Sequence, residues 1–227
     1  MRESSSSQKC LAARRVSRTA PEVAPTATVL IRFRVAINII GERGRRGRDN
    51  DNDLTLQHKG EPLGERIIVH GHVLDEDGRG VPNTLVELWQ ANACGRYIHV
   101  VDQHPAPLDP NFTGAGRTQS DSEGCYRFVT IKPGAYPWGN HHNAWRPAHI
   151  HFSVFGHSFV SRLVTQMYFP GDPLFPFDPI FNSVTDEKAR NRMISDFDLE
   201  NTKPDWALCY RFNIVLRGRN ATLMETK

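Results

Sequence analysis

Hydrophobic and polar residues alternate in short runs from Asp49 onward, and clusters of Gly, Pro, Asp and Ser separate these runs. The alternation predicts strands at 65–74, 83–90, 161–169 and 210–217, the first two joined by a turn at 77–82, and a further hairpin turned at 121–124. In the last strand we expect Tyr210, Phe212, Ile214 and Leu216 to share one face. Many short strands between turns are typical of an all-β protein, so a β-sandwich is predicted.

Residues 185–198 show a different period, because Ala189, Met193 and Phe197 recur at four-residue spacing. Thr185 is the predicted N-cap, and acidic residues follow it in the first turn. We therefore expect one short helix, packed on the outside of the sheets.

The first part of the chain lacks this regular pattern of short strands and turns. Residues 1–28 are rich in Ser, Ala, Pro and Arg and hold almost no large apolar side chains, which predicts disorder. Residues 30–40 alternate and predict a short strand, and the Arg-Gly run after them is interpreted as a solvated linker. The chain is thus divided into a poorly ordered basic leader, 1–48, and one β-sandwich domain, 49–227.

Charge follows the same division. Residues 1–48 carry eleven Lys and Arg against three Asp and Glu, whereas the remainder carries 17 against 22. The formal net charge of +3 therefore does not describe the predicted domain, and it gives no support to a nucleic-acid-binding function. No apolar stretch is long enough to cross a membrane.

The four cysteines, Cys10, Cys94, Cys125 and Cys209, are scattered, without a C-x-x-C pair. Neither a zinc-finger set nor a disulfide framework is indicated, and a reducing cytoplasm is the expected location.

The segment RPAHIHF places His149 and His151 on a predicted strand, where alternate side chains face the same way. Two imidazoles then converge on one spot. Tyr136 lies in a loop thirteen residues before His149, and Tyr97 follows the end of another predicted strand. Each residue also has a structural interpretation, since histidine is often half-buried in ordinary packing and tyrosine often lies at a rim.

Six segments in order through residues 50–220 carry a more specific signal: ELWQANACGRYIH, APLDPNFTGAGRTQSDSEGCYRF, IKPGAYPW, WRPAHIHF, TQMYFPGDPL and CYRFNIVLRG. In these segments the chain resembles the intradiol ring-cleavage dioxygenases, a family with non-haem iron. Within the family it is most similar to the beta chains of the protocatechuate-cleaving branch. The resemblance implies a β-sandwich of the prealbumin-like type.

The resemblance also implies a set of site residues. One Fe(III) per chain would be held by Tyr97, Tyr136, His149 and His151, with Tyr136 acting in turn as ligand and base. A hard trivalent ion prefers anionic oxygen, which agrees with two phenolates. The remaining implied roles are charge stabilisation by Arg146, orientation of ligands or oxygen by Gln166, and lining of the substrate cavity by Trp138 and Ile180. Arg146 also has an interpretation as a surface guanidinium, and Trp and Ile also fill ordinary cores.

The implied reaction is cleavage of protocatechuate by O2 between its two hydroxylated carbons. Its product is 3-carboxy-cis,cis-muconate, in the degradation of aromatic compounds by the beta-ketoadipate pathway. The implied partner is a homologous alpha chain in a hetero-oligomer. Residues 1–48 do not resemble the ordered N-terminal arm of the family's beta chains.

Two other functions remain open on the sequence. A catechol or hydroxyquinol 1,2-dioxygenase shares the ligand series, but carries a helical N-terminal segment that the pattern before residue 50 does not predict. A non-catalytic binding module is the third interpretation, because prealbumin-like sandwiches serve several functions. Phenolate-to-iron charge transfer would colour the enzyme red-brown and leave the module colourless.

Overall fold

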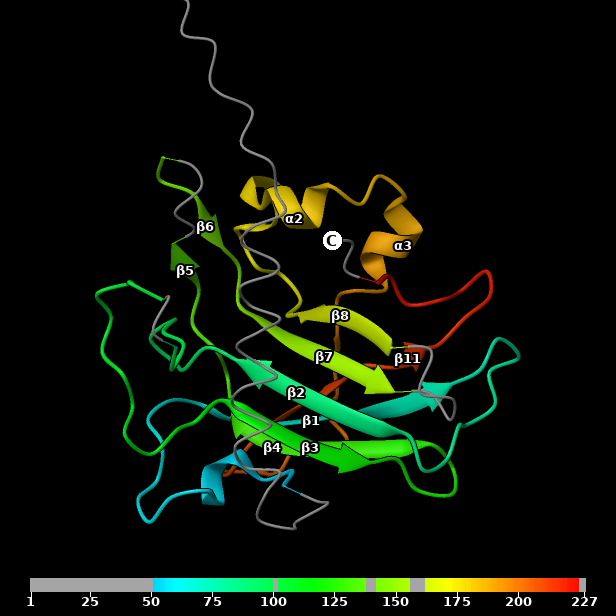
Figure 1. The fold of residues 1–227 in the computed structure, drawn as a ribbon, viewed down its shortest axis with the longest axis horizontal. Helices are drawn as coiled ribbons and strands as arrows, with labels where there is room; N and C mark the ends of the chain where they lie inside the picture. The colour runs from blue at the N-terminus through cyan, green and yellow to red at the C-terminus, as the bar shows by residue number, and fades with distance from the viewer. Residues whose placement is uncertain (1–50, 100–101, 138–141, 156–161, 225–227) are drawn as a thin grey trace, which may run out of the picture.

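The computed structural model describes residues 51–99, 102–137, 142–155 and 162–224, which form two facing β-sheets (Figure 1). The first sheet has the order β3-β2-β7-β8, with antiparallel pairing throughout. Its strands are β2 (Leu85–Gln90), β3 (Ala115–Gln119), β7 (His149–Phe155) and β8 (Arg162–Tyr168).

The second sheet is built around β1 (Arg66–Leu74). β4 (Cys125–Ile131) pairs with β1 in antiparallel fashion on one edge. β10 (Leu208–Arg211) and β11 (Ile214–Val215) pair in parallel with successive parts of β1, and β9 (Asp196–Phe197) pairs with β10. A separate ribbon joins β5 (Tyr136–Pro137) to β6 (Trp145–Arg146).

The core lies between the two sheets. Ile67, Val69 and Val73 of β1 point into it at alternate positions, and Leu88 of β2 and Phe152 of β7 meet them from the other side. All five side chains are fully buried. One apolar layer shared by two sheets is the arrangement of a β-sandwich, so the all-β prediction is confirmed.

The two predicted hairpins are wrong in their pairing, although their strands exist. β1 leads to β2 and β3 leads to β4, yet each connection crosses from one sheet to the other. A strand has only two edges, and those of β1 are taken by β4 on one side and by β10 and β11 on the other. β2 therefore pairs with β3 and β7.

The predicted helix 185–198 is shorter in the structure, where α3 covers only Glu187–Asn191. Its N-cap is Asp186, whose carboxylate accepts from the Lys188 N–H, and not Thr185. After α3 the chain pairs with the end of β8, because the backbone of Tyr168 bonds to Met193 and Ser195. Those bonds replace the helical ones that the periodicity predicts.

Three further short helical segments occur in the described residues: the 3-10 turns η1 (Leu54–Leu56) and η2 (Phe175–Phe177), and α2 (Pro179–Asn182). In Figure 1, α2 and α3 lie together beyond the β8 edge of the first sheet. α2 is a second helix beside the one expected from the sequence. It begins with a proline after an Asp N-cap, a combination that favours a helix start.

The predicted strand 210–217 is divided into β10 and β11, although its buried face is as expected. Tyr210, Phe212 and Ile214 are buried, and Leu216 packs against the same core. The predicted strand at 30–40 and the leader 1–48 lie outside the described residues.

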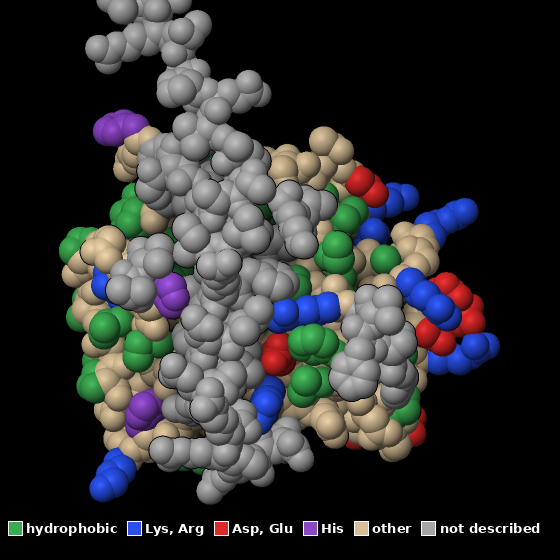
Figure 2. Space-filling model, viewed as in Figure 1, with side chains coloured by type: hydrophobic (Ala, Val, Ile, Leu, Met, Phe, Trp, Pro, Cys, Tyr) green, Lys and Arg blue, Asp and Glu red, His purple; other side chains and the backbone are tan. Residues whose placement is uncertain are grey.

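Charged side chains of both signs gather at the end of the molecule away from β5 and β6 (Figure 2). In the connection between β1 and β2, Arg79 pairs with Asp77 at 2.8 Å, and Glu76 of the same connection pairs with Arg217 at 3.3 Å. Mixed signs make local ion pairs and not a single-sign field. None of the helices in the described ranges is long and apolar enough to span a membrane.

Candidate metal centre

Six of the predicted site residues, Tyr97, Tyr136, Arg146, His149, His151 and Gln166, contact one another at the end of the first sheet where β2 and β8 end and β7 begins. Figure 1 shows this end of the sheet. His149 and His151 alternate on β7 and face the same way. Strand register sets His149 opposite Tyr168 and His151 opposite Gln166 of β8. All four side chains are buried, so the sheet itself builds one wall of the site.

Two loops bring the tyrosines to this wall. Gly95 has φ +75°, and a Cβ there would lie 2.2 Å from the carbonyl oxygen of Ala135. Glycine thus lets the loop before Tyr97 touch the loop before Tyr136. The two phenol rings meet edge to face at 5.5 Å between centroids. Both are buried, which excludes the rim position that the sequence left open for each.

The imidazole of His149 has a defined tautomer. Its Nδ1 lies 2.7 Å from the carbonyl oxygen of Pro147, which can only accept, so Nδ1 carries the proton. Nε2 then holds the lone pair. It points to the Tyr136 hydroxyl at 3.1 Å, in the tilted ring contact between the two residues. A fixed Nδ1–H with Nε2 directed inward is the usual arrangement of a ligating histidine.

His151 is fixed by stacking. Its ring is parallel to the indole of Trp89 within 3°, with 4.9 Å between centroids, and the two residues are in register between β7 and β2. The ring of His149 meets His151 edge to face, also at 4.9 Å. Trp89 was not among the residues predicted from the sequence, because a tryptophan on a buried strand is by itself indistinguishable from core packing.

Arg146 is completely buried, which excludes its interpretation as a surface guanidinium. Its Nη2 donates to Gln166 at 2.7 Å and to Asp178 at 3.0 Å, and its Nη1 lies 3.0 Å from Nε2 of His149 and 3.4 Å from the Tyr136 hydroxyl. Nη2 also lies 2.7 Å from the hydroxyl of Tyr168.

These neighbours decide the charge of Arg146. Burial acts to lower its pKa, but the oxygens of Tyr168, Tyr136 and Asp178 together raise the pKa well above its ordinary value. The guanidinium is therefore a fixed cation within the site, held by a carboxylate that is itself fully buried.

Asp178 and Tyr168 are functional neighbours that sequence reasoning missed. Asp178 caps α2 through the Ile180 N–H at 3.0 Å while it pairs with Arg146. The Asp-Pro step signals only the capping role. Tyr168 donates to Gln166 at 2.9 Å, and its place two residues after Gln166 on an alternating strand is the signal that would have found it.

The remaining two predicted residues, Ile180 and Trp138, are those implied to line the substrate cavity. Ile180 is half-buried on α2, next to the Asp178 cap. Trp138 lies outside the described residues.

The four predicted ligands fit a ferric ion in their chemistry. Two phenols offer oxygens that become anionic on losing a proton, and two imidazoles offer neutral nitrogens. The rings of Tyr97, Tyr136, His149 and His151 form one chain of contacts, and all four side chains are buried. Burial keeps such a centre away from bulk water.

Comparisons with known proteins identify the family of this chain. Residues 43–218 match the family described as "Dioxygenase". The protocatechuate 3,4-dioxygenase beta chain of Burkholderia cepacia is 69% identical over 177 residues, which are 77% of this chain and 75% of the relative. The alpha chain of the corresponding enzyme of Pseudomonas putida is 28% identical over 73% of this chain and 78% of its own length.

Among solved structures, the hydroxyquinol 1,2-dioxygenase of Pseudomonas putida DLL-E4 has a similar fold, with a TM-score of 0.53 and 19% identity. The match covers 83% of this chain and 74% of that one. A sequence identity this low supports a similar fold and nothing more. The family match over most of the chain, together with the 69% identical relative, shows that this chain belongs to the intradiol ring-cleavage dioxygenases.

Proposed function

We propose that this chain is the beta chain of a protocatechuate 3,4-dioxygenase, which opens the protocatechuate ring with O2 to give 3-carboxy-cis,cis-muconate. The observation that carries the proposal is the buried contact chain of two phenols and two imidazoles beside a fixed guanidinium. The 69% identity to a beta chain of that enzyme supports the choice of substrate. The same identity favours protocatechuate over catechol or hydroxyquinol.

Tyr97, Tyr136, His149 and His151 would hold one Fe(III). When bound, the ion would supply a Lewis acid able to activate a catecholic dianion. His149 contributes the Nε2 lone pair, since its Nδ1 proton is engaged by Pro147. Trp89 holds the ring plane of His151 by stacking.

Tyr136 is the proposed base. Its hydroxyl oxygen lies within hydrogen-bond reach of His149 Nε2 and Arg146 Nη1, in a buried position at the start of β5. A phenolate oxygen there accepts a proton from a substrate hydroxyl without a change in backbone position. Its register opposite Arg146 across β5 and β6 keeps the two groups together.

Arg146 is the proposed electrostatic catalyst. Asp178, Gln166 and Tyr168 all bond to Nη2 of the guanidinium and hold it in place, so no reorganisation is needed when negative charge develops on the substrate ring. Gln166 is a positioning residue in this scheme, because it acts through Arg146 and the hydroxyl of Tyr168. Ile180 and Trp138 are proposed to line the substrate cavity.

The proposed partner is a homologous alpha chain. Alpha chains of the enzyme share ancestry with this chain, as the 28% identical example from Pseudomonas putida indicates. We propose an alpha–beta hetero-oligomer in the cytoplasm, within the catabolism of aromatic acids by the beta-ketoadipate pathway.

The test uses the chain co-expressed with an alpha chain. We expect red-brown protein with about one iron per beta chain, as four protein ligands for a single ion imply, and oxygen uptake with protocatechuate that exceeds the uptake with catechol. Replacement of Tyr97 by Phe or His151 by Gln should remove both iron and colour. Colourless wild-type protein without iron would favour the binding module, and a preference for catechol would favour the 1,2-dioxygenase.

A conservative control separates loss of the ligand from loss of the fold. Tyr126 is also a buried tyrosine, but it lies in the core between the sheets, where its hydroxyl donates to the carbonyl of Phe212. Tyr126→Phe should keep iron and colour. Full iron occupancy in Tyr97→Phe would contradict the ligand assignment.

A further inference from the structure

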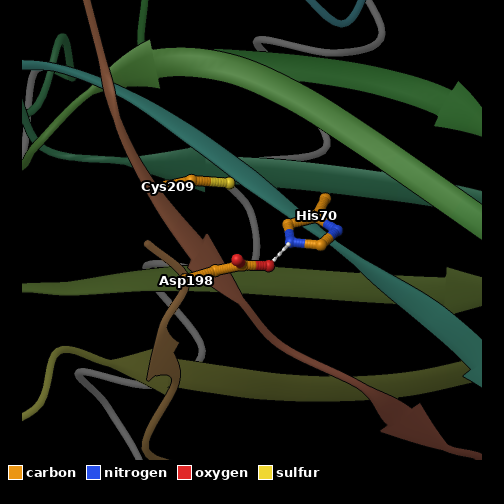
Figure 3. Close-up of side chains that lie close together, drawn as sticks. All are labelled: His70, Asp198 and Cys209. Carbon is orange, nitrogen blue, oxygen red and sulfur yellow. Dashed lines mark hydrogen bonds and ion pairs between the residues drawn. The ribbon is translucent and has the colours of Figure 1, made fainter. Parts of the chain in front are cut away.

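A second group of potential metal ligands lies on the outer face of the second sheet, apart from the candidate iron centre. His70 of β1, Cys209 of β10 and Asp198, which follows β9, each direct one donor atom into a common space (Figure 3). These three atoms lie within 4.8 Å of one another. Nitrogen, sulfur and carboxylate oxygen are the three kinds of protein ligand that zinc takes.

Strand alternation explains why the group exists. Ile67 and Val69 of β1 face the core, so His70 faces outward, and on β10 the inward Tyr210 leaves Cys209 on the outer face. The register pairs Ile68 with Cys209, which sets the thiol close to His70 across parallel strands. The segment 198–207 then folds back over this face and covers Cys209.

The positions of Asp198 and Cys209 are tied by three hydrogen bonds. The Asp198 N–H donates to the Cys209 carbonyl at 2.8 Å, and the Cys209 N–H donates to the Thr202 hydroxyl at 3.0 Å. That hydroxyl in turn donates to the Asp198 carbonyl at 2.9 Å. A carboxylate and a thiol held by one network form a preorganised pair of ligands.

The carboxylate is charged at neutral pH. Hydrogen bonding from the Asn201 side chain is the main cause that lowers the pKa of Asp198 to about 2, with His70 adding to it and burial opposing it. Its Oδ2 lies 2.8 Å from Nε2 of His70. On a tetrahedral ion two such ligand atoms stand about 3.4 Å apart, so a small outward shift admits the cation between them.

A surface hollow of about 480 Å³ borders the group, because His70 and the buried Cys209 both line it. The charged residues that line the hollow are of both signs, Asp121 together with Arg127 and Lys203, and the ligand group itself offers a single carboxylate. Hard ions such as Ca²⁺ and Mg²⁺, which need several oxygen ligands, are therefore disfavoured. A borderline-soft ion bound through a thiolate is favoured.

We propose that His70, Asp198 and Cys209 form a second metal site, for a divalent ion of the zinc class, with the fourth position open to the hollow. Binding releases the thiol proton to solvent, and the ring proton of His70 moves to Nδ1 so that Nε2 presents its lone pair. The ion links β1, β10 and the segment 198–207. The site does not depend on the proposed dioxygenase activity.

The experiment uses the full chain with iron already bound, dialysed against Zn²⁺ and then analysed for both metals. We expect about one zinc per chain beyond the iron, as a single three-residue site predicts. Co²⁺ added in place of Zn²⁺ should give a thiolate-to-cobalt charge-transfer band in the difference spectrum. Cys209→Ala should lose the extra zinc and the band while keeping its iron.

Two matched variants keep the test decisive. Cys125→Ala removes another thiol that lines the same hollow, and it should bind zinc like the wild type. His70→Asn retains a side chain able to donate to Asp198, and it should bind zinc at least about tenfold more weakly. The assignment is overturned if the wild type binds no zinc beyond the iron, if Cys209→Ala binds as the wild type does, or if Cys125→Ala also loses the metal.

Discussion

At the scale of single residues, the buried ion pair of Arg146 and Asp178 is the feature of the site with the largest desolvation cost. Both side chains are fully excluded from water, at 3.0 Å from one another. Moving two charges out of water is costly, and only close pairing with further hydrogen bonds offsets that cost. Gln166 and Tyr168 supply those further bonds.

We therefore expect Asp178→Asn to lower the free energy of unfolding by about 3 kcal/mol, because it leaves a buried guanidinium without its counter-charge. Urea denaturation measures the change. The matched control is Asp77→Asn, which breaks an ion pair of similar length whose side chains are 57% and 76% exposed, and it should change stability far less. Equal losses in the two variants would show that Asp178 does not compensate the buried charge.

Most of the individual site residues could be predicted from the sequence. The two histidines are on one face of a strand because of a period of two, and family resemblance supplied the tyrosines and Arg146. The pairing of Asp178 with Arg146 could not be predicted, because the two residues are 32 positions apart in the sequence. The Asp-Pro step at Asp178 indicates only a helix cap. Side-chain pairing across such a separation has no local signature.

At the scale of elements, the first sheet carries a polar ladder across three strands. Glu87 of β2 is in register with Ser153 of β7, and Arg162 of β8 donates to Ser153 at 2.7 Å and to Glu87 at 3.4 Å. Burial is the main cause that raises the pKa of Glu87, and Arg162 offsets it only in part. Burial likewise lowers the pKa of Arg162.

A raised carboxyl pKa means that the folded state holds the proton more tightly than the unfolded state. The contribution of Glu87 to stability therefore falls as pH rises from its ordinary pKa of 4.5 toward neutrality. Compared with the wild type, Glu87→Gln should gain stability over that range, as measured by urea denaturation at a series of pH values. Glu76→Gln alters an exposed pair with Arg217, and it should change stability far less. A flat difference for Glu87→Gln would contradict the role of burial.

The longer strands followed from the sequence, but their partners did not, and the two-residue strands β5, β6 and β9 were not predicted. The alternation that predicts β1 and β2 is the same whether a connection turns back within one sheet or crosses to the other. The choice depends on β10 and β11, which come from the far end of the chain to occupy an edge of β1. The shortened α3 has the same origin, because its periodicity competes with pairing to β8.

At the scale of the whole molecule, the candidate iron centre gathers residues from separate parts of the described chain. Tyr97 comes from the loop after β2, Tyr136 from β5, and the histidines from β7. In the unfolded chain these groups are far apart, so an ion that binds all four stabilises only the folded state. An ion bound there would therefore couple the loops to the sheet.

Removal of iron with a chelator should lower the thermal midpoint of the protein by about 5 °C or more, as tight binding to the native state alone requires. Calorimetry before removal, after removal and after adding iron back measures the effect. In His151→Gln, which is expected to bind no iron, the chelator should have no effect on the midpoint. A wild-type midpoint that is unchanged by chelation would mean that the four groups are not held together by the ion.

The crossing connections have a practical consequence. The tips that join β1 to β2 and β3 to β4 both lie at the far end of the sandwich from β5 and β6 (Figure 1). Gly78 in the first tip has open space around it, because a Cβ added there would meet no heavy atom within 4 Å. A fluorescent label or an affinity tag inserted there would report on the protein in cells without approaching the ring-cleaving end.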